Sequence, residues 1–262
     1  MKKRIALILT TIVALVLVLT GCSNGKKSAN DDTKTAGTLT IGLEGTYAPY
    51  SYRDNGKLTG FEVDLGKAVA KKLDLKAKFV PTKWDSLIAG LNSNTFDVVL
   101  NNVAENPSRQ KHYIFSTPYI YSKSVIITKD GTGINSVDDI KGKKISAGTG
   151  TDNYNHAEKF GAKVVPAADF QTDMSMIDQG RVAGAINSKE AFLYWKKSHK
   201  STDLKYITIP DNKLEPSKIA PIYNKKSTHL RGRVNKAIKE LYADGTMKKL
   251  SIKYFGEDIT KK

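Results

Sequence analysis

The chain has 262 residues, with 42 Lys and Arg against 26 Asp and Glu, which gives a formal charge of +16. This length is enough for one large domain or two modest ones. The single cysteine excludes an intramolecular disulfide, so the fold must rest on its hydrophobic core. A charge of this size favours contact with polyanions such as anionic lipid, phosphate-rich wall polymers or host polymers, and it carries no information about the fold.

Residues 1–21 have the pattern of a lipoprotein signal peptide. Basic residues at positions 2–4 precede an apolar run over residues 5–19, which is short for a membrane-spanning helix. The run ends in Leu-Thr-Gly-Cys at residues 19–22, and these residues resemble a bacterial lipobox. That resemblance implies cleavage before Cys22, diacylation of its sulfur, and a lipid-anchored protein on the extracytoplasmic face of the cell membrane.

Residues 22–37 are mostly Gly, Ser, Asn, Asp and Lys, and we interpret them as a flexible tether. Loss of the basic residues 2–4 with the leader leaves +13 of the formal +16 charge. The chain is expected to be exported and has no zinc-finger, RNP or other basic-aromatic pattern. We therefore expect no nucleic-acid partner.

The first third of the folded part alternates between strand and helix patterns. Apolar residues alternate with polar ones at the start, and later recur at helical spacing. Asp54-Asn55-Gly56 marks a tight turn between them. The order is strand, helix, strand, helix, strand, over residues 39–43, 61–73, 76–80, 84–91 and 97–103. This order predicts a parallel sheet with helices on its faces.

The pattern restarts after an apolar strand at residues 124–129, which predicts a second α/β unit. Residues 219–223 are interpreted as a second crossing between the units. Two helices, at residues 230–241 and 247–255, close the chain and are expected to pack back on the first unit. Within the second unit we expect further strands at 144–147, 162–165, 182–187 and 204–209, and helices at 152–160, 172–179 and 188–197.

Arg109 follows a predicted helix start. Asn106 is a good N-cap, and Pro107 is well placed in the first turn, where its missing N–H costs nothing. A cation at a helix N-terminus opposes the macrodipole, so Arg109 needs a reason to be there. One reason is an anion held between the guanidinium group and free backbone N–H groups. The alternative is a solvated surface arginine.

Several motifs in this order and spacing resemble the extracellular amino-acid-binding proteins of bacterial ABC importers, solute-binding protein family 3. The match covers residues 38–256. It is carried by Glu44-Gly-Thr-Tyr-Ala-Pro-Tyr-Ser, Gly60-Phe-Glu-Val-Asp-Leu, Trp84-Asp-Ser-Leu-Ile, Arg109 followed by Phe115-Ser-Thr-Pro-Tyr119, Lys141-Gly-Lys-Lys, Gly150-Thr151, Gly180-Arg-Val and Asp244-Gly-Thr-Met-Lys-Lys-Leu.

The resemblance implies an α/β, two-lobed type II periplasmic-binding fold with two hinge strands. Residues 38–122 and 222–262 would form the first lobe, and residues 123–221 the second. The hinge crossings are expected near 122–127 and 217–222. The ligand would lie in the cleft between the lobes and be sealed by their closure.

The resemblance also implies a set of ligand contacts. Arg109 would bind the ligand α-carboxylate. The Ala104 N–H and N–H groups near Gly150, Thr151 and Asp152 would add donors. Glu44 and the Asn102 carbonyl would face the ammonium group. Tyr47 and Trp84 would flank the ligand, although Trp84 also fits a core position of its own helix and Tyr47 fits loop packing. The full set is Glu44, Tyr47, Trp84, Asn101, Asn102, Ala104, Arg109, Gly150, Thr151, Asp152, Ser188 and Glu190.

Two positions depart from the family pattern. Ser188 stands where the family usually has an aspartate that pairs with the α-ammonium. Glu190, Asp152 or Glu44 must then supply the carboxylate, because a desolvated ammonium without a partner is costly. The second departure is Asn101-Asn102-Val103, which is similar to the Asn-Gln-Val of cystine-binding members.

These observations favour a monomeric, lipid-anchored binding protein that delivers a polar amino acid, cystine as the best candidate, to a membrane permease. Glutamine or a basic amino acid is the alternative ligand, and a basic surface adhesin or polyanion-binding protein is the alternative class. An enzyme is disfavoured, because it would need a carboxylic acid of raised pKa in the cleft, and Glu44 and Glu190 already have binding roles. We expect no cofactor and no metal, since the four histidines lack ligand spacing and Gly148-Thr-Gly150 lacks the third glycine of a dinucleotide loop.

Overall fold

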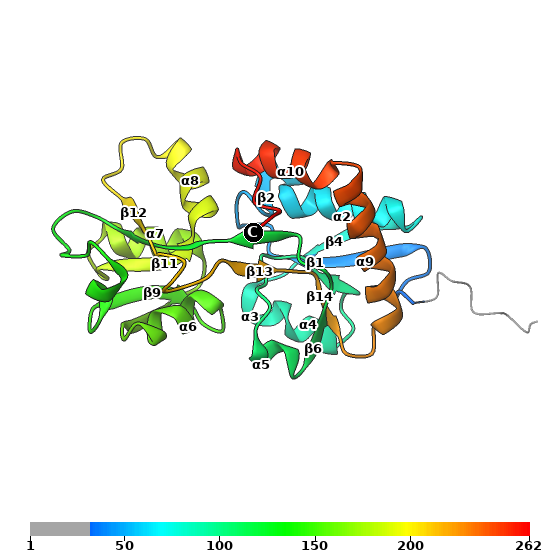
Figure 1. Ribbon diagram of the computed structural model, residues 1–262, viewed down its shortest axis with the longest axis horizontal. Helices are drawn as coiled ribbons and strands as arrows, with labels where there is room; N and C mark the ends of the chain where they lie inside the picture. Colours follow the sequence, from blue (N-terminus) through cyan, green and yellow to red (C-terminus); the bar gives the residue numbers. More distant parts are fainter. Residues whose placement is uncertain (1–31) are drawn as a thin grey trace, which may run out of the picture. The chain divides into compact units, whose positions relative to one another are not determined.

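The computed structural model describes residues 32–262, which contain two five-stranded sheets, each with helices packed on it (Figure 1). We call each sheet with its helices a lobe. The predicted signal peptide, Cys22 and most of the predicted tether lie outside the described residues. Within residues 32–262, no helix is both long enough and apolar enough to cross a membrane.

The sheet of the first lobe has the strand order β4-β1-β5-β14-β6. Strand β1 runs parallel to β4 and to β5, as expected for successive β-α-β units. Strand β14 enters late in the chain and runs antiparallel to both β5 and β6. The bounds are β1 Thr38–Leu43, β4 Lys76–Pro81, β5 Val98–Val99, β6 Tyr113–Phe115 and β14 Ile222–Asn224.

Helices cover both faces of the first sheet. Neighbouring residues of β5 point to opposite faces, so Val98 packs with α2 and α9 whereas Val99 packs with α3 and α4. The two closing helices, α9 and α10, contact α2, which confirms the expectation that they return to the first lobe. The bounds are α2 Phe61–Lys72, α3 Trp84–Leu87, α4 Ala89–Asn92, α5 Pro107–Gln110, α9 Thr228–Ala243 and α10 Thr246–Phe255.

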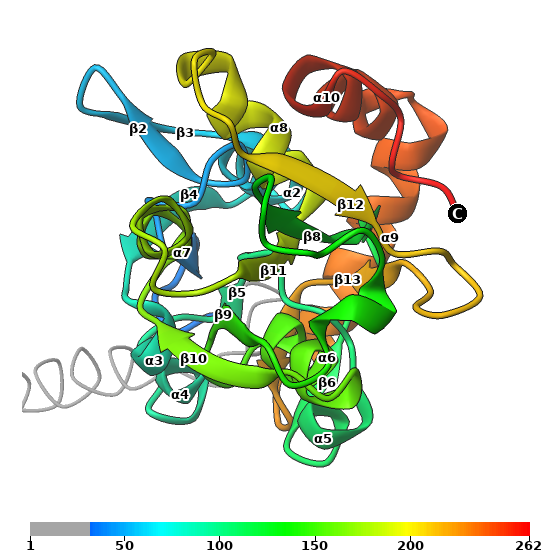
Figure 2. The ribbon, with the colours of Figure 1, turned by 90° about the vertical axis from the view of Figure 1, so that its left-hand side faces the viewer.

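The second sheet has the order β10-β9-β11-β8-β12 (Figure 2). Strands β10, β9 and β11 are parallel, and β8 is antiparallel to β11 and β12. Ile145 and Ile186 pack with α6, whereas Ala185 packs with α7 and α8, so helices cover both faces here too. The bounds are β8 Ser124–Thr128, η1 Val137–Ile140, β9 Lys144–Gly148, α6 Asp152–Lys159, β10 Lys163–Ala167, α7 Phe170–Asp178, β11 Gly184–Ser188, α8 Lys189–Ser198 and β12 Lys205–Thr208.

Two chain segments connect the lobes. The outgoing segment contains β7 (Ile120–Ser122) and the returning segment contains β13 (Ser217–Ile219), and the two strands pair antiparallel. Figure 1 shows both segments passing between the two sheets.

Three local predictions need correction. The strand predicted over residues 97–103 is only Val98–Val99, because Asn102 takes a positive φ of 46° that a strand cannot continue through. The helix predicted over residues 84–91 is divided into α3 and α4 around Ile88. The helix that begins at Pro107 has four residues, so it carries little macrodipole.

The tight turn predicted at Asp54-Asn55-Gly56 is confirmed. It joins strands β2 (Tyr52–Asp54) and β3 (Lys57–Thr59) as an antiparallel hairpin. Asn55 and Gly56 both have positive φ, 49° and 79°, as a two-residue turn of this kind requires.

The start of the folded part also differs from the predicted boundary. We placed residues 32–37 in the flexible tether, whereas the structure ties two of them to the first lobe. The Asp32 carboxylate lies 2.8 Å from Arg233 and 2.7 Å from His229 on α9. The Lys34 N–H donates to Asp97 Oδ1 at 2.6 Å. The chain therefore meets the first lobe beside the N-terminal half of α9.

A candidate ligand cavity between the lobes

A cavity of about 840 Å³, including the part that opens to solvent, lies between the two lobes. This volume suits a small molecule. Its lining residues follow the carboxyl ends of parallel strands: Glu44 after β1, Asn101 after β5, Thr151 after β9 and Asp169 after β10. Open α/β sheets bind ligands at this edge, because the loops that leave the strands there converge.

Ten of the twelve residues predicted for the site line this cavity, and they come from both lobes. Gly150 and Glu190 do not line it. The ten are Glu44, Tyr47, Trp84, Asn101, Asn102, Ala104, Arg109, Thr151, Asp152 and Ser188.

Arg109 marks one end of the cavity. Its side chain is 11% exposed, and Nη1 donates to the Ala104 carbonyl at 2.7 Å. Nη2 donates to the Gly150 carbonyl of the second lobe at 3.0 Å. Burial lowers the pKa of the guanidinium, and the nearby Asp152 opposes that fall. Arginine stays charged even so, and the group therefore bridges the lobes as a cation.

Asp152 and Asn106 complete this end of the cavity, which we call the Arg109 end. Asp152 Oδ1 lies 3.7 Å from Arg109 Nη1 and accepts a hydrogen bond from Asn106 Nδ2 at 2.5 Å. The same Asn106 side chain accepts the Arg109 backbone N–H at 2.8 Å, so the predicted N-cap is confirmed. That N–H is therefore used by the cap and is not one of the free N–H groups that could meet an anion.

Trp84 lies over the Arg109 end and reaches across to the second lobe. The Arg109 guanidinium carbon is 5.6 Å from the centre of its ring. Its Nε1 donates to the Thr149 carbonyl at 2.9 Å. Trp84 also packs against the core cluster of α3, as its interpretation as a core residue of this helix predicts.

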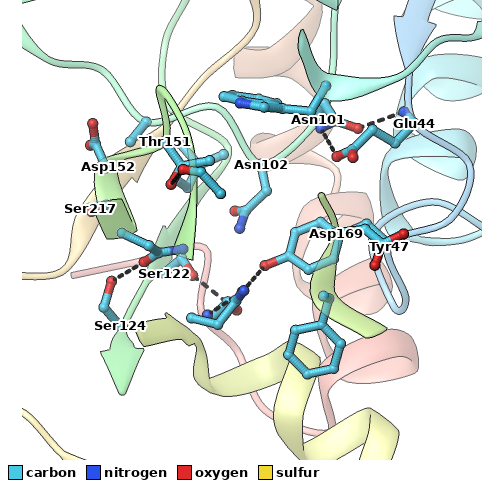
Figure 3. Close-up of a pocket in the computed structure, with 18 of the residues that line it drawn as sticks. Glu44, Tyr47, Asn101, Asn102, Ser122, Ser124, Thr151, Asp152, Asp169 and Ser217 are labelled. Atoms are coloured by element: carbon cyan, nitrogen blue, oxygen red, sulfur yellow. Dashed lines mark hydrogen bonds between the residues drawn. The ribbon is translucent and has the colours of Figure 1, made fainter. Parts of the chain in front are cut away.

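Glu44, Asp169 and Asp173 line the opposite side of the cavity, which we call the acidic end. Figure 3 shows Asp152 on one side and Glu44 with Asp169 on the other. Asn101 holds Glu44 by accepting its backbone N–H at 2.7 Å and donating to Oε2 at 2.6 Å. Burial raises the pKa of Glu44 despite that hydrogen bond, and the charges of Asp169 and Asp85 raise it further.

Tyr47 and Asn102 stand beside the acidic end. The Tyr47 hydroxyl donates to Asn187 Oδ1 on β11 at 2.6 Å, another direct bond between the lobes (Figure 3). Asn102 is held from behind, because its backbone N–H donates to the buried Glu62 carboxylate at 2.5 Å. Its side chain points into the cavity, and the buried Oδ1 atom has no hydrogen-bond partner within the described part of the chain.

Glu190 does not take the position that sequence reasoning offered it. Its Oε2 accepts hydrogen bonds from three buried hydroxyls: Tyr50 at 3.1 Å, Ser122 at 3.0 Å and Ser188 at 2.7 Å. These donors come from the first lobe, from β7 and from β11. Glu190 therefore ties the lobes together beside the connecting strands and lies behind the wall of the cavity.

Sequence reasoning missed Asp173, which also lines the cavity. Phe170, Asp173, Met174 and Ile177 share the spacing of one helix face, and all four are buried in α7. A carboxylate on an apolar helix face is rarely buried without a purpose, so this pattern could have identified it. Other missed lining residues are Thr46, Ser122, Ser124, Gly148, Asn153, Ala168, Asp169, Phe170, Asn187, Ser217 and Ile219.

No cluster of three or more His, Cys, Asp and Glu residues that could hold a metal ion occurs within residues 32–262.

Comparison with known proteins places this geometry in a family. Residues 39–257 match the model of the bacterial extracellular solute-binding proteins, family 3. The chain belongs to this family. It is 40% identical to the L-cystine-binding protein TcyA of Bacillus subtilis over the full length of both chains.

Solved structures show the same two-lobed type II fold. An ancestral arginine-binding protein bound to arginine is 33% identical with a TM-score of 0.78, covering 84% of this chain and 99% of that one. The L-cystine solute receptor of Neisseria gonorrhoeae, in an unliganded open conformation, is 36% identical with a TM-score of 0.61, covering 90% of this chain and 98% of that one.

Proposed function

We propose that this family member is the substrate-binding lipoprotein of an amino-acid ABC transporter, with cystine as its best candidate ligand. The observation that carries the proposal is a cavity between two lobes with a buried guanidinium at one end and carboxylates at the other. An α-amino acid needs one site for its anion and one for its cation. The names of the relatives support cystine first and arginine second.

In this proposal Arg109 binds the ligand α-carboxylate and Glu44 receives an ammonium group. Trp84 and Tyr47 border the ligand on opposite sides. Aliphatic ligands are disfavoured, because the polar lining would lose water without gaining partners. A ligand with an acidic side chain is disfavoured too, since Arg109 is the only basic side chain among the described residues that line the cavity.

The lobes would be formed by residues 38–122 with 222–262 and by residues 123–221, and they would close over the ligand. Three bonds that cross the cleft support a closed arrangement, namely Trp84 to Thr149, Arg109 to Gly150 and Asn106 to Asp152. A difference between two solved structures supports this proposal. The gonococcal receptor was solved in an open conformation. Its TM-score with this chain is lower than that of the ancestral arginine-binding protein, although its sequence identity is higher, and a different arrangement of the lobes accounts for this difference.

Calorimetric titration of the purified full-length protein with cystine, cysteine, glutamine, arginine and glutamate tests the proposal. We expect cystine to bind at tens of micromolar or better. If another amino acid binds and cystine does not, the ligand changes and the transport class stays. If none of them binds, the proposed function is wrong.

We further propose that the mature protein is a monomer anchored through a diacylated Cys22, and that it delivers its ligand to permease subunits of the transporter. The support is the lipobox at residues 19–22. The intact mass of the native protein tests the anchor: an unmodified Met1 start, or release as a soluble product, would contradict it.

The alternative of a polyanion-binding surface protein rests on the formal charge of +13 that remains when residues 2–4 are lost from the +16 of the whole chain, and it is compatible with transport. Such binding should collapse between low and high salt, whereas an enclosed amino-acid site should respond little.

We infer binding rather than catalysis, although Glu44 and Asp173 meet the condition of a raised pKa in the cleft. Each carboxylate is already hydrogen-bonded by a fixed amide, Asn101 or Asn187. Turnover of a keto-acid precursor by the purified protein would contradict this inference.

A further inference from the structure

Asp173 is a buried carboxylate with one hydrogen-bonded oxygen and one oxygen without a partner among the described residues. The residue is 1% exposed and lines the cavity from α7. Its Oδ2 accepts from Asn187 Nδ2 at 2.9 Å. Its Oδ1 is buried and has no hydrogen-bond partner among residues 32–262, although the buried Ser146 hydroxyl, which has no partner either, lies close enough to lower the pKa of Asp173. An unsatisfied buried carboxylate oxygen is costly, so a donor is expected to meet it in the working protein.

The orientation of Asn187 fixes this arrangement. Asn187 Oδ1 accepts from the Tyr47 hydroxyl at 2.6 Å and from the Ser188 N–H at 2.8 Å. Its amide nitrogen must then face Asp173. Tyr47 thus positions Asp173 from the other lobe through one intervening amide.

A second acceptor without a partner lines the same cavity, the buried Oδ1 of Asn102. Asp173 and Asn102 belong to different lobes and both present oxygen acceptors. A ligand group that satisfies such atoms must donate hydrogen bonds. A primary ammonium carries three donors and no acceptor, so it fits this pair better than a carboxylate or a thioether.

The surrounding charge favours a cation as well. Asp169 caps α7, with Oδ1 accepting the Thr172 N–H at 2.8 Å, and its charge acts on both Glu44 and Asp173. No described Lys, Arg or His forms an ion pair with any of these three carboxylates. Burial and the charge of Asp169 raise the pKa of Asp173 to about 7, against the lowering effect of Ser146 and Asn187. A cation bound in the acidic end would lower the pKa of Asp173 and favour its charged form.

We propose that Asp173, with Asn102 and the charges of Asp169 and Glu44, binds a second cationic group on the side arm of the ligand while Arg109 holds the α-carboxylate. This inference rests on the amino-acid-binding function proposed above and narrows its ligand class. The preferred ligands carry an ammonium group beyond the one on their α-carbon. The distal half of cystine and the side chain of a basic amino acid both provide one.

Two ligand pairs test this, with Cys22 alkylated so that no thiol exchanges with a disulfide. The mixed disulfide of cysteine with cysteamine keeps a side-arm ammonium, and the one with 3-mercaptopropionate keeps a side-arm carboxylate. Lysine and norleucine form the second pair, without a disulfide: lysine has a side-arm ammonium and norleucine has no charged side-arm group. In whichever pair the protein binds, we expect the ammonium-bearing member to bind at least tenfold more tightly. Binding of the disulfide pair would indicate a cystine-like ligand, and binding of the lysine pair would indicate a basic amino acid.

Asp173→Asn should remove most of that preference. It should weaken the binding of the ammonium-bearing ligand at least tenfold and should not weaken the binding of its partner. Asp169→Asn, which keeps an N-cap side chain, should act in the same direction with a smaller change of about threefold. Asp178→Asn is the matched control, since Asp178 is an exposed carboxylate at the end of the same helix and its loss should change affinity less than twofold.

An equal loss of affinity for both ligands of a pair in the Asp173→Asn variant would show that Asp173 binds the α-ammonium, and it would overturn the proposal. Unchanged affinity for both would overturn it too, provided circular dichroism shows a folded variant. If Asp173→Asn does not fold, Asp169→Asn decides by the same criterion. If the wild-type protein binds no amino acid, both the proposed function and this inference are wrong. If the wild-type protein binds an amino acid but Asp173→Asn lacks the expected effect, only this inference is wrong.

Discussion

The two ends of the cavity treat buried charge in opposite ways. At the Arg109 end, a guanidinium lies 3.7 Å from the Asp152 carboxylate and donates to two backbone carbonyls. At the acidic end, Glu44 and Asp173 have raised pKa values, mainly because of burial, and neither forms an ion pair within the described residues.

This difference indicates which end is complete without a ligand. The Arg109 end satisfies its own charges and joins the lobes, so a ligand carboxylate arriving there must share Arg109 with Asp152 and Gly150. The acidic end keeps unused acceptors and unneutralised carboxyls, so the ligand supplies what is missing. We therefore expect the Arg109 end to determine whether an amino acid binds, and the acidic end to determine which one.

The largest expected effect is at the Arg109 end. Arg109→Ala removes the carboxylate partner of the ligand and the bond to Gly150 together. Loss of one member of a buried charge pair costs about 2–5 kcal/mol, so affinity should fall from tens-fold to thousands-fold for every amino acid that binds. Calorimetry measures this, with the exposed Arg181→Ala as control. A change of less than threefold would contradict the assignment of Arg109.

The next effect is on stability and concerns Glu62, which lies behind Asn102 and feels the charge of Glu44. Burial raises its pKa from 4.5 to about 7. A carboxyl whose pKa is higher in the folded state stabilises the fold most at low pH, and that contribution is lost as the pH rises through the range from 4.5 to 7. The shift corresponds to about 3 kcal/mol of unfolding free energy.

Glu62→Gln should abolish this pH dependence while its side-chain oxygen still accepts from Asn102 and Tyr119. The unfolding free energy of the variant minus that of the wild type should therefore rise by about 3 kcal/mol between about pH 5 and about pH 8. Urea denaturation at several pH values measures it, and Asp173, which does not act on Glu62, titrates in both proteins and cancels in the difference. A difference that stays constant with pH would show that Glu62 is charged in the folded protein.

The smallest effect tests the connection between the lobes at the acidic end. Tyr47→Phe removes only the hydroxyl that donates to Asn187. A hydrogen bond of this kind contributes about 0.5–1.5 kcal/mol. Because Asn187 orients toward Asp173 through this bond, affinity for a ligand with a side-arm ammonium should fall about threefold to tenfold. Tyr194→Phe, outside the cavity, is the control. An equal loss of affinity for ligands without that ammonium would show that Tyr47 does not act through Asp173.

Local features of this protein were readable from its sequence, because they depend on residues a few positions apart. The Asn55-Gly56 turn, the Asn106 cap on Arg109 and the helical faces of α2 and α9 are of this kind. Their order along the chain, with the family motifs, predicted the two-lobed α/β fold and placed ten of the twelve expected site residues on the cavity wall.

Only the tertiary structure decided how the polar side chains pair. Tyr47 meets Asn187 across 140 positions of sequence, and Tyr50 meets Glu190 across the same separation. The first contact helps to orient Asp173 toward the cavity, and the second holds Glu190 behind its wall. Sequence spacing does not distinguish these outcomes, because both carboxylates lie on helices of the second lobe. The packing of one lobe against the other determines which carboxylate is satisfied internally and which still has an acceptor to offer a ligand.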